Sequence, residues 1–168
     1  MNELWHVSED PSIEVFHPHH HELHALDEPL VWAVDTTYWW LYWFPRDCPR
    51  ACFNAVEDTT DEDVERWLDG DREGRVAVIE PGWLEPLRNA TLYSYRMPAQ
   101  PFERWDKFFI SRETVVPLEV VELDDLPARH AEAGNELRIE PSLYPLWDEV
   151  IETTLDFSGI RLRNAVRP

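Results

Sequence analysis

Short apolar segments separated by polar turns occur along the whole chain, and most have the length of a β-strand. Residues 91–97 alternate between two faces, as a half-buried strand does, and residues 30–34 form a continuous apolar run typical of a central strand. Pro117 predicts an edge or a break in the strand-like segment 115–123, because proline cannot donate to a ladder. The other segments predicted as strands are residues 4–7, 51–56, 76–79, 108–110 and 137–139.

Helical spacing is clearest near the C-terminus. Ser142 predicts a helix start, the apolar residues from Leu143 to Leu155 recur at i, i+3, i+4 and i+7, and Gly159 is the expected end. Strands outnumber helices and the two do not alternate strictly. The prediction is therefore an α+β fold with a mixed, mostly antiparallel twisted sheet and a C-terminal amphipathic helix. The other predicted helices are residues 38–43, a segment between Thr59 and Gly70, residues 81–87 and residues 124–133.

Length and charge narrow the class of protein. A chain of 168 residues is expected to form a single globular domain, 1–168. The net charge of -19 opposes binding to nucleic acids and anionic membranes, which both depend on Lys and Arg. No apolar run approaches the ~20 residues that a bilayer requires, and the first residues lack the basic and apolar regions of a secretory leader. A cytoplasmic location is expected.

A polar, His-rich loop is predicted over residues 17–29. Imidazole suits zinc, copper and nickel, but His21 and His24 lie only three positions apart, which is not the HExxH spacing of a zinc protease. We therefore predict no functional metal site and expect adventitious metal binding at most, with a metal-binding function of this loop kept as an alternative. The histidines concerned are His17, His19, His21 and His24.

The segment FPRDCPR combines two prolines and two arginines. Arg46 and Arg50 each carry a planar guanidinium that can hold a phosphate or carboxylate, and the alternative is a structural turn with an internal pair to Asp47. Cys48 and Cys52 are too few for a zinc site and are predicted to be free thiols. The two arginines would lower the pKa of Cys48 if they lie close to it.

Two further segments carry candidate binding residues. His6 shares one face of the first predicted strand with Ser8, so both are predicted to line a ligand cleft. Residues 157–168 are predicted to form an Arg-bearing tail docked on the body. In an extended tail, Arg161 and Arg163 share a face.

Nine tryptophans give the chain an unusually aromatic composition. The rings of residues 38–44 cannot all face one core from one helix, so part of this run is predicted to lie at an interface or a cleft wall. This favours a second class of function, a non-catalytic protein-interaction or homodimerising module that uses an aromatic surface.

Four strings carry a resemblance to a known family. WHVSEDPSI, VWAVD, YWFPRDCPR and FSGIRLRNA resemble an uncharacterised bacterial family of small single-domain proteins, and the resemblance spans Leu4 to Ala165. It implies no activity.

The order of elements is also similar to the ADP-ribosyltransferase-like fold. That resemblance implies NAD in a cleft between two small sheets, with His6 near the nicotinamide ribose and Tyr38 or Tyr42 packed on the nicotinamide. The stretch comparable to the one with that fold's catalytic glutamate, residues 107–111, holds no acid, so the sequence leaves enzymatic activity open. The residues predicted to bind NAD or another nucleotide are His6, Ser8, Tyr42, Arg46, Arg50, Arg161 and Arg163.

Overall fold

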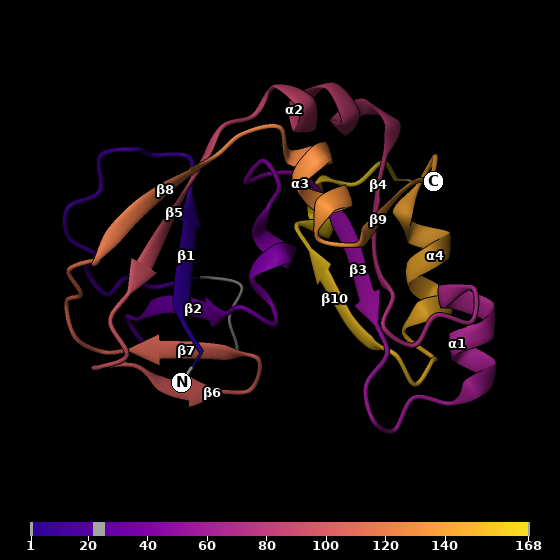
Figure 1. Ribbon diagram of the computed structural model, residues 1–168, viewed down its shortest axis with the longest axis horizontal. Helices are drawn as coiled ribbons and strands as arrows, with labels where there is room; N and C mark the ends of the chain where they lie inside the picture. The colour runs from indigo at the N-terminus through magenta and orange to yellow at the C-terminus, as the bar shows by residue number, and fades with distance from the viewer. Residues whose placement is uncertain (1, 22–25, 168) are drawn as a thin grey trace. The chain divides into compact units, whose positions relative to one another are not determined.

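The chain divides into two compact units, each with its own β-sheet (Figure 1). The computed structural model describes residues 2–21 and 26–167. Unit 1 comprises Met1–Trp43 and Thr91–Asp124, and unit 2 comprises Phe44–Ala90 and Asp125–Pro168. Each unit is therefore built from two separate stretches of sequence. That both belong to one folding domain, 1–168, stays a prediction.

Unit 1 contains a six-stranded antiparallel sheet in the order β6-β7-β2-β1-β5-β8. Successive side chains of each strand point to opposite faces of the sheet, and each face buries its own group of apolar residues. One face packs Leu4, Val31 and Tyr95 beneath Phe16 and Val115, which bridge to each other. The elements are β1 (Leu4–Ser8), β2 (Val31–Asp35), the 3₁₀-helix η1 (Trp39–Tyr42), β5 (Leu92–Met97), β6 (Glu103–Trp105), β7 (Phe108–Ser111) and β8 (Glu119–Leu123).

The helix predicted at residues 38–43 is instead the four-residue η1. Asp35 ends β2, and its carboxylate accepts from the backbone N–H of Thr37 at 3.0 Å, which forms a local turn. Trp39 then stacks on Trp5 of β1, with ring centroids 4.3 Å apart, and its indole N–H donates to Ser94 at 2.8 Å. The aromatic run is thus held against the sheet of unit 1.

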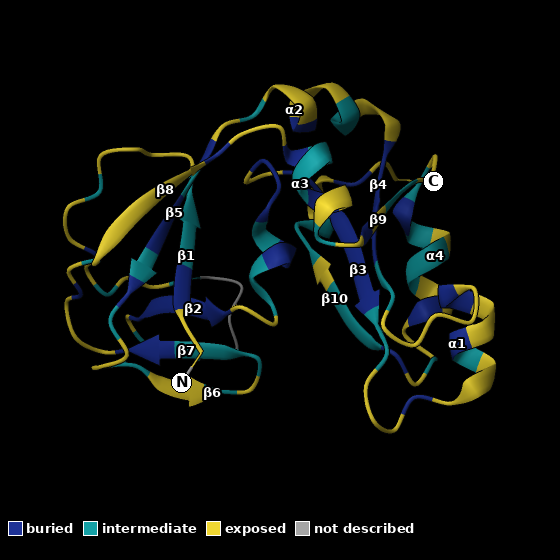
Figure 2. Ribbon diagram, viewed as in Figure 1, coloured by how far each residue is buried: buried dark blue, intermediate teal, exposed yellow. Residues whose placement is uncertain are grey.

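Unit 2 contains a four-stranded sheet in the order β10-β3-β4-β9, in which only β4 and β9 run parallel. Apolar residues of α1 and α4, among them Trp67 and Leu143, pack with Phe53 of β3. Figure 2 shows β3 and β4 buried along most of their length. The elements are β3 (Arg50–Asn54), α1 (Asp61–Leu68), β4 (Arg75–Ile79), η2 (Pro81–Trp83), α2 (Leu84–Asn89), α3 (Leu126–Glu132), β9 (Asn135–Ile139), α4 (Leu143–Val150), β10 (Asp156–Ile160) and η3 (Leu162–Asn164).

The α+β fold with mostly antiparallel strands is confirmed, and the strands form two open sheets. The C-terminal helix is shorter than predicted. Helix α4 ends at Val150, because the hydroxyl of Thr153 donates to the carbonyl of Val150 at 2.7 Å and the chain turns there. Gly159 therefore lies within strand β10 and does not end the helix.

Candidate functional site

His6 has a structural role in unit 1. The paired part of the β1–β2 ladder stops at Trp5 and Val34. The carbonyl of Trp32 then lies 2.8 Å from Nδ1 of His6, and since a carbonyl only accepts, Nδ1 carries the proton of this bond. The imidazole also packs on Phe16 at 4.8 Å between ring centroids. His6 is half-buried at the end of this ladder.

The segment after β1 crosses one face of unit 1 and includes the second predicted cleft residue. The hydroxyl of Ser8 accepts from the backbone N–H of Asp10 at 3.1 Å. The phenol of Tyr95 donates to the carbonyl of Asp10 at 2.6 Å and accepts from the N–H of Ile13 at 3.1 Å. Ser8 and Tyr42 both lie in unit 1 and are both half-buried. Ligand binding by either residue stays a prediction.

The FPRDCPR segment opens unit 2 and folds around a buried arginine. Arg50 is buried, donates to the carbonyl of Cys48 at 2.9 Å and stands over the Phe44 ring at 5.0 Å from its centroid. The Phe44 ring also contacts His130 of α3, with ring centroids 4.7 Å apart. An arginine in this position braces the turn from inside through a backbone carbonyl and an aromatic ring. Ligand binding by Arg50 stays a prediction.

The thiol of Cys48 is unreactive by environment. Burial raises its pKa to about 12; the nearby charge of Arg50 acts to lower it and that of Glu80 to raise it. Arg50 lies close enough to lower the pKa of Cys48, as the sequence suggested, but burial raises this pKa by more. Both cysteines are buried free thiols.

We expect both cysteines of the folded protein to resist alkylation. With a pKa near 12, the thiolate fraction of Cys48 at about pH 8 is about a thousandfold below that of an ordinary cysteine. Iodoacetamide followed by mass spectrometry should leave the native chain unmodified and add two groups after unfolding in guanidinium. Rapid modification of Cys48 in the native protein would contradict this placement.

The C-terminal tail docks on the same turn. The Nε of Arg161 donates to the carbonyl of Arg46 at 3.2 Å, and the amide of Asn164 donates to the carbonyl of Asp47 at 2.8 Å. Two segments that the sequence singled out separately are thereby brought together, and Arg46 and Arg161 are joined by a hydrogen bond within unit 2. Arg163 is exposed.

The tail is not extended after β10, so the condition under which Arg161 and Arg163 would share a face is not met. Arg161 has a left-handed backbone, with φ of 55°, and residues 162–164 form η3. Both carboxylate oxygens of buried Glu80 accept from the N–H of Val166, at 2.9 and 3.0 Å. Arg161 and Arg163 therefore do not share a strand face, and the backbone of the tail makes the docking contacts.

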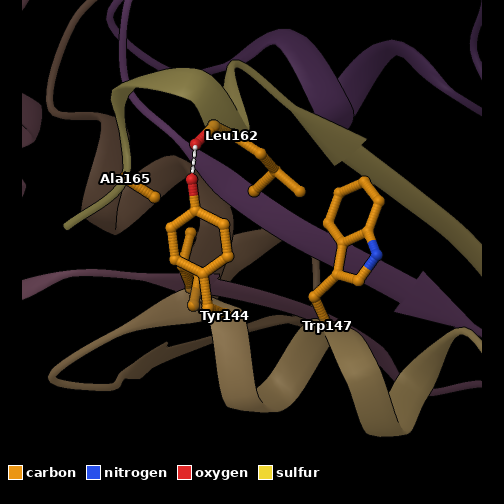
Figure 3. A pocket seen from close by; sticks show the side chains of 5 residues that line it. Tyr144, Trp147, Leu162 and Ala165 are labelled. Carbon is orange, nitrogen blue, oxygen red and sulfur yellow. Dashed lines mark hydrogen bonds between the residues drawn. The ribbon is translucent and has the colours of Figure 1, made fainter. Parts of the chain in front are cut away.

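Figure 3 shows how α4 closes against this tail. The hydroxyl of Tyr144 donates to the carbonyl of Leu162 at 3.4 Å, and Trp147 lies beside the same leucine. The apolar hollow that these residues form with Leu143 and Ala165 leaves no room for a water molecule. It is a packing contact. A second hollow, of about 560 Å³, is open to solvent and is lined by Ala55, Val56, Glu57, Arg72 and Glu73.

The His-rich loop is described in part. His17 and His19 are exposed, and the rings of His19 and His21 lie 5.4 Å apart. His24 lies outside the described residues. Among the residues that the structure describes, no three His, Cys, Asp or Glu side chains gather closely enough to hold a metal ion.

Sequence reasoning did not select the apolar surface that the structure exposes at β8. Val116, Leu118, Val120 and Val121 are 62%, 55%, 49% and 36% exposed. β8 is an edge strand, paired only with β5 in the described sheet. Figure 2 shows it exposed along most of its length. The sequence feature that pointed to this edge was Pro117, which predicted an edge or a break in the strand-like segment 115–123.

Other edge strands of the two sheets carry charges that discourage pairing. On β6, Glu103 forms an ion pair with Arg112. On β9, Arg138 pairs with Glu136 at 2.6 Å. Charged side chains on an edge are a common protection against strand addition. β8 also carries two exposed charges, Glu119 and Glu122, but between them two adjacent valines are exposed on opposite faces.

Comparison with known proteins places the chain in a family without an assigned activity. None of its described helices has the length and apolar character needed to cross a membrane. No curated protein and no solved structure matches the chain. A family model does match, over residues 5–165, which is nearly the whole sequence and includes every candidate residue discussed above. The chain therefore belongs to the family of unknown function DUF6886.

Proposed function

We propose that this chain is a non-catalytic protein-interaction module that accepts an extended segment of its partner as an additional strand on β8. The observation that carries the proposal is the exposed apolar edge formed by β8 and the residues just before it. Backbone groups on the outer side of an edge strand are available to a new strand, and exposed alternate side chains supply specificity. Soluble proteins rarely leave such an edge uncovered without a use for it.

The interaction surface differs from the one that the aromatic composition suggested. In the run of residues 38–44, Trp40, Leu41, Trp43 and Phe44 are buried and the other three residues are half-buried. These rings pack mainly inward. Exposed apolar side chains gather instead at residues 116–121, which include no aromatic residue.

Nucleotide binding at His6 is supported less well. One imidazole nitrogen is bonded to a backbone carbonyl and the ring packs on Phe16, so a structural role accounts for the residue. A rise in melting temperature with NAD or ADP-ribose that His6→Ala abolishes would favour that function. Metal binding by the His-rich loop likewise stays a prediction.

A display library of random peptides tests the proposal. We expect selected peptides to bind the wild-type chain and to lose about tenfold or more in affinity when Val120 and Val121 are both replaced by Ser, because apolar contact area is lost. Val56→Ser, at another exposed valine, is the matched control and should bind like the wild type.

The position of the bound peptide is measured by amide hydrogen exchange. Strand addition should slow exchange at alternate residues of β8, those whose N–H groups point away from β5. If the selected peptides protect another surface, or if the double variant binds them with unchanged affinity, the proposal fails. Melting temperatures of both variants check that the fold is retained.

A further inference from the structure

We propose that the strand which β8 accepts is cationic, with a core of two apolar residues flanked on each side by Lys or Arg. This inference rests on the proposed function of β8 and names the chemistry of its partner. It follows from the order of side chains on the strand and from the charge around it.

Acidic residues surround the exposed valines. Residues 113–125 contain Glu113, Glu119, Glu122, Asp124 and Asp125 and no Lys or Arg. All five are exposed. An incoming strand therefore meets an excess of acidic side chains along this edge, which attracts a cationic segment and repels an acidic one.

The register on β8 sets the pattern of the partner. The central residues read Glu119-Val120-Val121-Glu122, and opposite residues of paired strands point to the same face. A partner residue opposite each valine finds an apolar neighbour, and one opposite each glutamate finds a carboxylate. The matching core is thus basic–apolar–apolar–basic, and it reads the same for a parallel or an antiparallel partner.

The two glutamates are not equivalent. Glu119 already forms an ion pair with Arg96 across the β5–β8 ladder. Glu122 lies opposite Tyr93 and forms no ion pair with any residue in the described part of the chain. Glu122 is therefore expected to contribute more of the preference for a cationic partner.

A second copy of this chain matches the edge poorly. Pairing two β8 strands with their valines adjacent places Glu119 opposite Glu122, and like charges directly opposite destabilise a pair. The net charge of -19 on each copy adds repulsion at longer range. A heterologous cationic strand is favoured on both counts.

Three labelled synthetic peptides with the same neutral ends test the inference. Their cores are Lys-Val-Val-Lys, Ser-Val-Val-Ser and Glu-Val-Val-Glu, and fluorescence anisotropy measures their affinities. At low ionic strength we expect the lysine peptide to bind about tenfold more tightly than the serine peptide, and the glutamate peptide to bind weakest. The preference should shrink as salt is raised to about 0.5 M, because these charges are exposed.

Two variants with the same change in net charge separate a local effect from a general one. Glu122→Gln should reduce the preference for the lysine peptide about threefold or more, while Glu152→Gln, at an exposed position of unit 2, should leave it unchanged. Equal effects of the two variants would overturn the inference, because attraction to the acidic chain as a whole would then explain the preference.

The remaining outcomes are distinguishable by hydrogen exchange at β8. If all three peptides protect β8 with equal affinity, strand addition stands and the cationic preference is wrong. If no peptide protects β8, the proposed function fails together with this inference. If sedimentation shows a dimer whose β8 amides are protected without peptide, a second copy is the occupant and the inference is overturned.

Discussion

Phe44→Ala is expected to lower the free energy of unfolding by about 3–5 kcal/mol, the usual cost of removing a buried phenylalanine ring. The ring is 2% exposed and contacts the His130 imidazole and the Arg50 guanidinium. Its removal opens a cavity beside two buried polar groups. For a chain of this length the melting temperature should fall by about 6–20 °C.

Phe44→Leu is the control, because it keeps most of the volume and loses the ring contacts. Its expected cost is about 1.5 kcal/mol or less. Thermal unfolding followed by circular dichroism measures both variants. A Phe44→Ala protein that melts within about 2 °C of the wild type would show that the ring does not organise this turn.

The same variant tests whether the two units form one folding domain. Phe44 belongs to unit 2, whereas the close tryptophan pairs, among them Trp5 and Trp39, belong to unit 1, and we expect them to give an exciton signal in circular dichroism. In a single domain, 1–168, this signal should disappear at the same lowered temperature as the rest of the structure. If it keeps the wild-type midpoint, the units unfold independently and the single-domain prediction is wrong.

The strands were predictable where one face is buried and the side chains alternate, as in β5. Strand β6 was not predicted, because the sequence Glu103-Arg104-Trp105 has no apolar alternation. The strand forms through backbone pairing with β7. Helix α4 was predicted too long because its apolar spacing continues past Val150, where the hydroxyl of Thr153 ends the helix. Local hydrogen bonding overrode the periodic pattern there.

The candidate surfaces were less predictable than the fold. Arg161 contacts the backbone carbonyl of Arg46, a residue far away in the chain. A contact to a backbone carbonyl does not depend on which side chain the residue carries, so the sequence pattern could not predict it. β8 is an edge strand because of the order of strands in the sheet. A sequence indicates strand order only indirectly, here through Pro117. Exposure of two adjacent valines follows from that position and not from their hydrophobicity.

Gly159→Ala is expected to destabilise the protein by about 1–3 kcal/mol, the range for an overpacked site. A Cβ atom at Gly159 would lie 2.2 Å from Cζ3 of Trp147 and 2.9 Å from Cδ1 of Leu162. The indole must therefore move away from β10, which disturbs its edge-to-face contact with Phe157 at 5.3 Å. The melting temperature should fall by about 3–10 °C.

Gly82→Ala is the matched control for this prediction, since a Cβ atom there meets nothing within 4 Å. It should change the free energy of unfolding by about 0.5 kcal/mol or less. The contact itself is tested by adding Gly159→Ala to a Trp147→Ala chain. Removing the indole removes the contact at 2.2 Å and leaves the flexible end of Leu162 at 2.9 Å, and alanine is favoured over glycine in a strand by about 0.5–1 kcal/mol. The same substitution should then become neutral or stabilising. An equal loss of stability with and without Trp147 would show that the indole is not what restricts residue 159 to glycine.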